Sequence, residues 1–208
     1  MLTTHLKVTG GRSRARRLLI SAVLMLAGMF PVASLKAADP PASQPDVTVR
    51  EERGLYSVTA RFQVPQTSAL ALAVLTDYEQ IPRFMPGVET SLVLERAAGR
   101  AVVEQEAVSR LMFFSKRVHL ILEITEAVDT LTFRDRSGTS FTSYEGTWRL
   151  CEENGHTQIL YELTARPSFE VPQFLLKRLL RRDAGQMIDG LRREIAARSA
   201  RDTSDPHD

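Results

Sequence analysis

Apolar and polar residues alternate along the first clearly patterned stretch of the chain, residues 56–64. The apolar face would carry Tyr56, Val58, Ala60, Phe62 and Val64, and every position between them is polar. A period of two is typical of a strand with one buried face. We therefore predict a half-buried strand within residues 47–64, with a turn at Arg53 and Gly54 before its best-patterned part.

A short helix is expected directly after this strand. Pro65 stops the strand, and Thr67 or Ser68 can cap a helix over residues 69–75. The helix should end near Asp77, and the two prolines that follow leave room for only one further short turn.

The period of two returns after Gly87 and continues for about 80 residues. Turn-forming residues interrupt it at 98–99, 129, 137–138 and 154–155, and links this short join antiparallel neighbours. The predicted strands cover residues 88–95, 100–109, 115–126, 130–136, 141–151 and 157–166.

One long amphipathic helix is predicted over residues 172–199. Its apolar stripe repeats at steps of three and four residues and consists of Leu176, Leu180, Ala184, Met187, Ile188, Leu191 and Ile195. Gly185 and Gly190 each cost about 1 kcal/mol relative to alanine inside a helix. Either they admit a close neighbour, or they are simply tolerated. Since a sheet with one apolar face needs a cover and this helix is the only element left, we predict an α+β fold.

The first 38 residues have the pattern of a secretory signal peptide. A basic segment precedes an apolar run from Leu18 to Leu35, and small residues follow at Ala37 and Ala38. We predict a signal peptide over 1–38, a linker over 39–46, a ligand-binding domain over 47–199 and a polar tail over 200–208. Cleavage implies export, to the periplasm in a Gram-negative bacterium. An uncleaved segment would instead anchor the protein in a membrane.

Removal of the signal peptide changes the sign of the net charge. The full chain has 27 basic and 25 acidic residues, and six of the basic residues lie before position 39. The remaining chain has 21 basic and 25 acidic residues, a net charge of about −4, which argues against a nucleic-acid partner. Residues 172–201 nevertheless carry +5. They are either an ordinary solvated helix face or a contact for an anionic membrane surface. The predicted membrane contacts are Lys177, Arg178, Arg181 and Arg182.

No constellation of catalytic or metal-binding residues stands out. Cys151 is the only cysteine, and only His119 and His156 fall within the predicted domain, without a partner at metal-ligand spacing. The sequence contains no phosphate-binding loop and no nucleophile elbow. We therefore predict no catalytic residue, no metal and no cofactor, and a binding protein is favoured over an enzyme.

Four segments resemble a known superfamily: residues 74–79 (Val-Leu-Thr-Asp-Tyr-Glu), 81–86 (Ile-Pro-Arg-Phe-Met-Pro), 114–117 (Phe-Ser-Lys-Arg) and 144–150 (Tyr-Glu-Gly-Thr-Trp-Arg-Leu). In this order of elements they resemble START-like proteins, in the polyketide cyclase/dehydrase branch that includes the coenzyme-Q-binding proteins. The resemblance covers residues 47–198.

The resemblance implies a helix-grip fold, in which a curved antiparallel sheet holds the C-terminal helix and short helices follow the first strand. A hydrophobic tunnel would lie between sheet and helix, with residues 77–88 at its lip. The residues expected to line it are Phe133, Leu122, Tyr144, Trp148, Tyr161, Phe84, Met187 and Leu191. The implied function is an exported carrier of a hydrophobic small molecule such as a lipid, isoprenoid or quinone.

Two other functions are compatible with the same fold. A cyclase or dehydratase would need an acid and a base paired inside the cavity. A protein-interaction module would have a filled core and no cavity, and periodicity alone cannot separate a filled core from a lined one.

Overall fold

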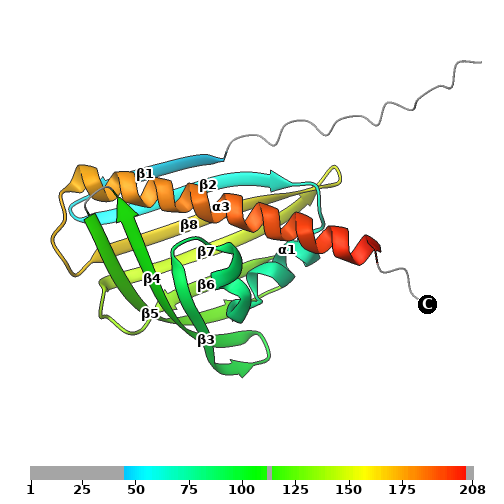
Figure 1. Ribbon diagram of the computed structural model, residues 1–208, viewed down its shortest axis with the longest axis horizontal. Helices are drawn as coiled ribbons and strands as arrows, with labels where there is room; N and C mark the ends of the chain where they lie inside the picture. Colours follow the sequence, from blue (N-terminus) through cyan, green and yellow to red (C-terminus); the bar gives the residue numbers. More distant parts are fainter. Residues whose placement is uncertain (1–44, 112–113, 205–208) are drawn as a thin grey trace, which may run out of the picture. The chain divides into compact units, whose positions relative to one another are not determined.

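The computed structural model describes residues 45–111 and 114–204, in which a long helix lies across one face of a single sheet (Figure 1). The elements are β1 (Asp46–Glu52), β2 (Leu55–Val64), α1 (Ser68–Leu75), the 3-10 turn η1 (Tyr78–Gln80), α2 (Ile81–Phe84), β3 (Val88–Ala97), β4 (Arg100–Leu111), β5 (Phe114–Glu126), β6 (Thr130–Asp135), β7 (Phe141–Glu153), β8 (His156–Pro167) and α3 (Gln173–Ser204).

The eight strands are ordered β1-β2-β8-β7-β6-β5-β4-β3, and all neighbours are antiparallel. The one pairing between strands that do not follow each other in the sequence joins β2 to β8, so strands from the beginning and the end of the sequence lie side by side. The predicted α+β helix-grip fold is confirmed, and α3 is the cover that the sheet's apolar face requires.

The predicted strands and helices are present, with ends that differ by a few residues. Thr67 caps α1 through a hydrogen bond that its side chain accepts from the backbone nitrogen of Leu70, at 3.3 Å. The main difference lies before the turn at Arg53 and Gly54. Residues there form a separate edge strand, β1, because the turn folds them back onto β2.

The face of β2 that alternation predicted to be buried, with Tyr56, Val58, Ala60, Phe62 and Val64, is buried in the structure. The inward residues of β5, β7 and β8 form one core with α3, whose Ile188, Leu191 and Ile195 have no exposed surface. The buried sheet residues in this core include Leu120, Leu122, Ile124, Leu131, Trp148, Leu150, Ile159, Tyr161, Leu163 and Ala165.

Helix α3 is held mainly along its flanks. Its backbone comes close to β1 and β2 on one side and to α1, α2 and β4 on the other. Over the described residues, no comparably close approach joins α3 to the central strands β5–β8. Side chains therefore separate the backbone of α3 from the backbone of the central strands.

The two glycines of α3 have different environments. A Cβ on Gly190 would overlap the carbonyl oxygen of Phe84 and lie 3.3 Å from Pro86 Cδ. Gly190 thus admits a close neighbour, the backbone of α2. A Cβ on Gly185 would meet nothing within 4 Å, so this glycine is merely tolerated.

The segment from Asp77 onward is fixed to both sheet and helix. Arg198 of α3 pairs with Asp77 at 2.8 Å, and the Tyr78 hydroxyl donates to Glu126 at the end of β5, at 2.7 Å. Arg96 lies over the Tyr78 ring, 5.2 Å from its centroid. These contacts make the segment a brace between the two layers.

The ends of the chain add two observations. The predicted signal peptide, residues 1–38, and most of the predicted linker lie outside the described residues. Helix α3 extends to Ser204, so the first part of the predicted polar tail is helical. Among the helices that the structure describes, none is long and apolar enough to span a membrane.

Candidate functional site

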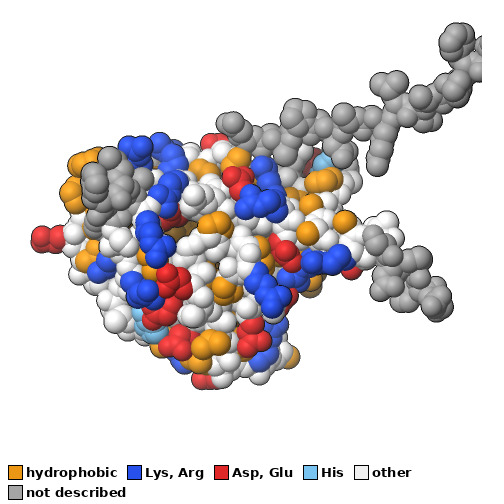
Figure 2. Space-filling model, viewed as in Figure 1, with side chains coloured by type: hydrophobic (Ala, Val, Ile, Leu, Met, Phe, Trp, Pro, Cys, Tyr) orange, Lys and Arg blue, Asp and Glu red, His pale blue; other side chains and the backbone are white. Residues whose placement is uncertain are grey.

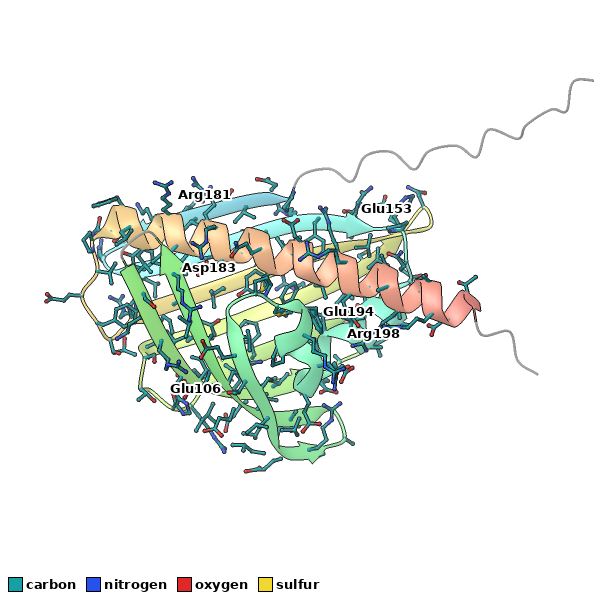
Figure 3. The ribbon with its side chains drawn as sticks, viewed as in Figure 1. Glu106, Glu153, Arg181, Asp183, Glu194 and Arg198 are labelled. Atoms are coloured by element: carbon teal, nitrogen blue, oxygen red, sulfur yellow. The ribbon has the colours of Figure 1, made fainter. Side chains whose placement is uncertain are left out.

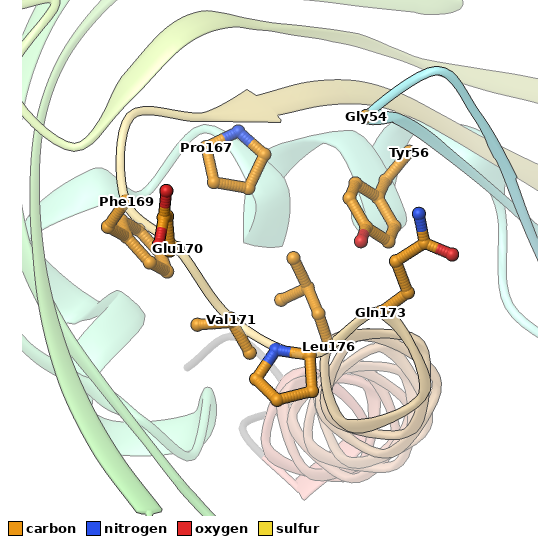
Figure 4. Close-up of a pocket in the computed structure, with 9 residues that line it drawn as sticks. Gly54, Tyr56, Pro167, Phe169, Glu170, Val171, Gln173 and Leu176 are labelled. Atoms are coloured by element: carbon orange, nitrogen blue, oxygen red, sulfur yellow. The ribbon is translucent and has the colours of Figure 1, made fainter.

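A pocket of about 650 Å³ lies where the first turn of α3 meets the end of β8 and the β1–β2 turn (Figure 4). The pocket is open to solvent, and its lining combines apolar and aromatic side chains with a hydroxyl, a carboxylate and an amide. The lining residues are Gly54, Tyr56, Pro167, Phe169, Glu170, Val171, Pro172, Gln173 and Leu176.

A row of aromatic rings leads from this pocket along the sheet. Phe169, in the pocket lining, lies 6.1 Å from Phe141, which lies 4.9 Å from Tyr144. Beyond Tyr144 the centroid distances are 5.9 Å to Phe133, 6.3 Å from Phe133 to Tyr161 and 4.4 Å from Tyr161 to Trp148. The row connects the pocket with the side chains expected to line a tunnel.

Two members of this row were not expected from the sequence. Phe141 occupies an odd position in β7, whereas the inward residues of that strand are even-numbered. A register shift between Phe141 and Ser143 brings Phe141 onto the inward face. Phe169 lies in the β8–α3 connection, where no periodicity exists to identify it. Both could be found only from the folded backbone.

A pair of tyrosine hydroxyls lies within the aromatic row. Burial is the main reason that the pKa of Tyr144 rises to about 12, although the neighbouring Tyr161 side chain opposes the rise. Burial also raises the pKa of Tyr161, and the neighbouring Tyr144 side chain adds to the rise. Both side chains are therefore neutral at physiological pH. Together they offer a hydrogen-bonding group inside an otherwise apolar interior.

Tyr144 and Phe133, in the middle of the aromatic row, are only partly buried. The hydroxyl of Tyr144 lies deep enough for burial to dominate its pKa, yet Tyr144 and Phe133 keep part of their accessible surface. Gly146 creates part of this arrangement, because a Cβ there would overlap the Phe133 ring.

The eight residues predicted to contact a ligand all belong to the main hydrophobic core or pack against it. Leu122, Trp148, Tyr161, Phe84 and Leu191 are buried in the main core, while Phe133, Tyr144 and Met187 are only partly buried against it. None of the eight lines the pocket at the start of α3. Whether they touch a ligand stays a prediction.

Polar side chains border the space between β4 and α3. Ser109 donates a hydrogen bond to Asp183 of α3, and Arg182 donates to the carbonyl oxygen of Arg110. Burial raises the pKa of Asp183 despite this bond and its ion pair with Arg182, which is 3.2 Å long. Figure 3 shows Asp183 on the edge of α3 that faces β4.

The predicted membrane contacts divide into two groups. Lys177 pairs with Glu51 of β1 at 3.7 Å, and Arg182 is engaged by β4 and Asp183. Arg178 and Arg181 are exposed and make no ion pair or hydrogen bond with any part of the chain that the structure describes.

The outer face of the sheet is lined mainly by polar side chains, unlike the face that packs against α3. A second pocket, of about 580 Å³, is lined by threonine, glutamate and arginine side chains as well as Phe133, and this lining does not suit a hydrophobic ligand. His119 also lies on this face, 2.8 Å from Glu106. Across residues 45–111 and 114–204, no three His, Cys, Asp or Glu side chains are grouped so that they could hold a metal ion.

A family model described as polyketide cyclase/dehydrase and lipid transport matches residues 64–192. This region extends from the end of β2 into the second half of α3. It therefore includes the whole aromatic row and all of the pocket lining except Gly54 and Tyr56. No curated protein matches the chain.

Several solved structures share the fold. A protein of Thermus thermophilus is 22% identical, with 69% of this chain and 99% of the other covered and a TM-score of 0.60. A STAR-related lipid transfer protein from Xanthomonas axonopodis is 19% identical, with coverages of 76% and 96% and a TM-score of 0.60. The ZhuI aromatase/cyclase from a Streptomyces species is 15% identical, with coverages of 70% and 96% and the same TM-score.

Proposed function

Because the chain belongs to the polyketide cyclase/dehydrase and lipid transport family, we propose that it binds and carries a hydrophobic small molecule between its sheet and α3. The ligand class is a lipid, an isoprenoid or a quinone. The observation that carries this proposal is the unbroken row of aromatic rings from Phe169, at the pocket, to Trp148, beneath the helix.

Apolar burial would supply the affinity. An apolar surface removed from water contributes about 25 cal/mol per Å², and large aromatic side chains present much of that surface at low entropic cost. The paired hydroxyls of Tyr144 and Tyr161 would orient an oxygen-bearing group of the ligand. A quinone or alcohol oxygen could accept a hydrogen bond from either hydroxyl.

Sequestration is favoured over a cyclase or dehydratase reaction. Neutral tyrosines with raised pKa values are poor bases at physiological pH, and the partly buried carboxylate of Asp183 is already occupied by Ser109 and Arg182. The relatives named above include both a lipid transfer protein and an aromatase/cyclase, and their fold alone does not decide between these functions.

We also propose that the protein is exported, on the basis of the basic and apolar segments of residues 1–38. Export would place the carrier beside a membrane, from which a hydrophobic ligand must be taken. The amino-terminal sequence of the protein isolated from its host tests this proposal. A first residue at Ala38 or Asp39 supports export with cleavage, and retention of Met1 contradicts cleavage.

Ligand binding can be tested with N-phenyl-1-naphthylamine, a neutral probe that fluoresces in apolar surroundings. We expect saturable binding that a Val171→Phe substitution weakens, because Val171 lines the pocket. Gln186→Phe adds an aromatic ring of the same size at an exposed position of α3 and should bind the probe like wild type. Probe binding that neither substitution alters would contradict entry at this pocket.

A further inference from the structure

One exposed face of α3 combines an aromatic ring with unpaired arginines. Phe174 lies in the first turn and is 76% exposed, and Arg178 and Arg181 follow it by four and seven residues. Residues at this spacing project from the same side of a helix. Figure 3 shows Arg181 on the edge of α3 opposite Asp183, away from β4. We call Phe174, Arg178 and Arg181 the docking face.

The local charge is strongly positive. The first ten residues of α3 contain four basic and no acidic residues. Negative side chains would be favoured in the first turn of a helix, so the absence of any there is not explained by helix stability. Figure 2 shows Lys and Arg side chains gathered over the first half of α3, with apolar side chains at its beginning.

Two of the four basic residues in this segment are already paired with other parts of the protein. Glu51 neutralises Lys177, and Asp183 and the Arg110 carbonyl oxygen occupy Arg182. Arg178 and Arg181 have no such partner in the described parts of the chain. Two unpaired guanidinium groups beside an exposed ring are therefore the distinctive chemistry of this surface.

We propose that the docking face binds the surface of an anionic lipid bilayer. The Phe174 ring would enter the headgroup region, and Arg178 and Arg181 would pair with lipid phosphates. The pocket lining includes Pro172, directly before α3, and Gln173 and Leu176 from its first turn, so docking would bring the pocket to the membrane. This inference rests on the proposed function, because it explains how a carrier meets its hydrophobic ligand.

The test uses the chain from Asp39 to Asp208, because these residues form one compact unit that contains the whole hydrophobic core. Co-sedimentation is measured with vesicles of phosphatidylcholine alone or mixed with phosphatidylglycerol. We expect binding only to the mixed vesicles, and weaker binding at high salt because the Debye length falls from about 10 Å at 0.1 M to about 3 Å at 1 M.

Substitutions should separate the contributions of the two arginines and of the Phe174 ring to vesicle binding. Loss of one arginine near an anionic surface weakens binding about fivefold, so Arg178→Gln with Arg181→Gln should weaken it roughly 25-fold. Phe174→Ser should weaken it about tenfold. The matched control, Arg100→Gln with Arg193→Gln, removes the same charge from exposed positions outside the docking face and should change binding less than about twofold. Arg193 is about 18 Å further along α3 than Arg181.

Absence of wild-type binding to the mixed vesicles would overturn the inference, and so would equal losses in the docking-face and control variants. Binding of N-phenyl-1-naphthylamine without vesicles is measured on the same proteins and should be unchanged. Probe binding without vesicle binding would contradict only the docking inference. Vesicle binding without probe binding would contradict the proposed function and leave the docking face intact.

Discussion

Gly190 of α3 and Phe84 of α2 are so close that a side chain on the glycine would overlap the phenylalanine carbonyl oxygen. The second half of α3 is thereby pressed against the brace formed by α2 and the segment before it. The ion pair between Arg198 and Asp77 holds the same half of the helix. A ligand that enters from the first half of α3, where the pocket lies, would not need to disturb this contact.

Substitution of Gly190 by alanine should lower the free energy of unfolding. In a helix interior, alanine normally stabilises a protein by about 1 kcal/mol relative to glycine. Here the overlap with Phe84 should outweigh this gain and lower the free energy of unfolding by about 2 kcal/mol. Gly185→Ala is the matched control, since nothing lies within 4 Å of its Cβ, and it should be neutral or stabilising by up to about 1 kcal/mol. Urea denaturation measures both, and equal effects would contradict the close contact.

The four tyrosines of the chain should resist ionisation together. Burial raises the pKa of Tyr56, Tyr78, Tyr144 and Tyr161, and the chain has no other tyrosine. The native protein should therefore show little tyrosinate absorbance at about pH 10, the normal midpoint. Since the folded state holds these protons more tightly, their contribution to stability should be complete below about pH 10 and fall as the pH rises toward about 12. A native titration midpoint near pH 10 would refute this expectation.

The hydroxyl pair of Tyr144 and Tyr161 should behave as one unit. Each side chain affects the pKa of the other, so Tyr161→Phe or Tyr144→Phe leaves the remaining buried hydroxyl without a polar neighbour and should cost about 1–2 kcal/mol. The double variant removes both polar groups and should cost less than the sum of the two. A double-mutant cycle by denaturant unfolding measures the coupling, and strict additivity would argue against an interaction between the two hydroxyls.

Asp183→Asn should affect stability in a pH-dependent way. The folded-state pKa of Asp183 is raised, mainly by burial, so the aspartate contributes most stability below pH 3.8 and loses it as the pH rises through the folded pKa. Asparagine does not titrate and can still accept the hydrogen bond from Ser109. The variant should therefore gain stability relative to wild type between acidic and neutral pH. A difference that stays constant with pH would contradict the raised pKa.

Alternation predicted most of the fold because the sheet buries one face almost without interruption. Leu122, Trp148 and Tyr161 are buried as expected, and the predicted strands differ from the observed ones by only a few residues. The burial of Phe141 was not predicted, because a register shift moves this residue to the other face of the sheet. The separate strand β1 was not predicted either, because a turn folds it back onto β2. Periodicity cannot detect either event, since both depend on pairing between strands.

The site was less accessible to sequence reasoning than the fold. The pocket assembles from a turn, a strand end, a connection and the first residues of α3, which share no common pattern. Likewise, the basic character of α3 was visible in the sequence, but the partners of Lys177 and Arg182 were not. Only the folded chain separates arginines that are occupied from those that remain free.

The central claim is that a hydrophobic molecule occupies the space between the sheet and α3. The most direct measurement is native mass spectrometry of the protein purified from its own host, followed by solvent extraction and identification of any released compound. We expect an adduct of one lipid, isoprenoid or quinone that leaves when the protein is unfolded. A protein that carries no such compound, and that also fails to bind N-phenyl-1-naphthylamine, would contradict the claim.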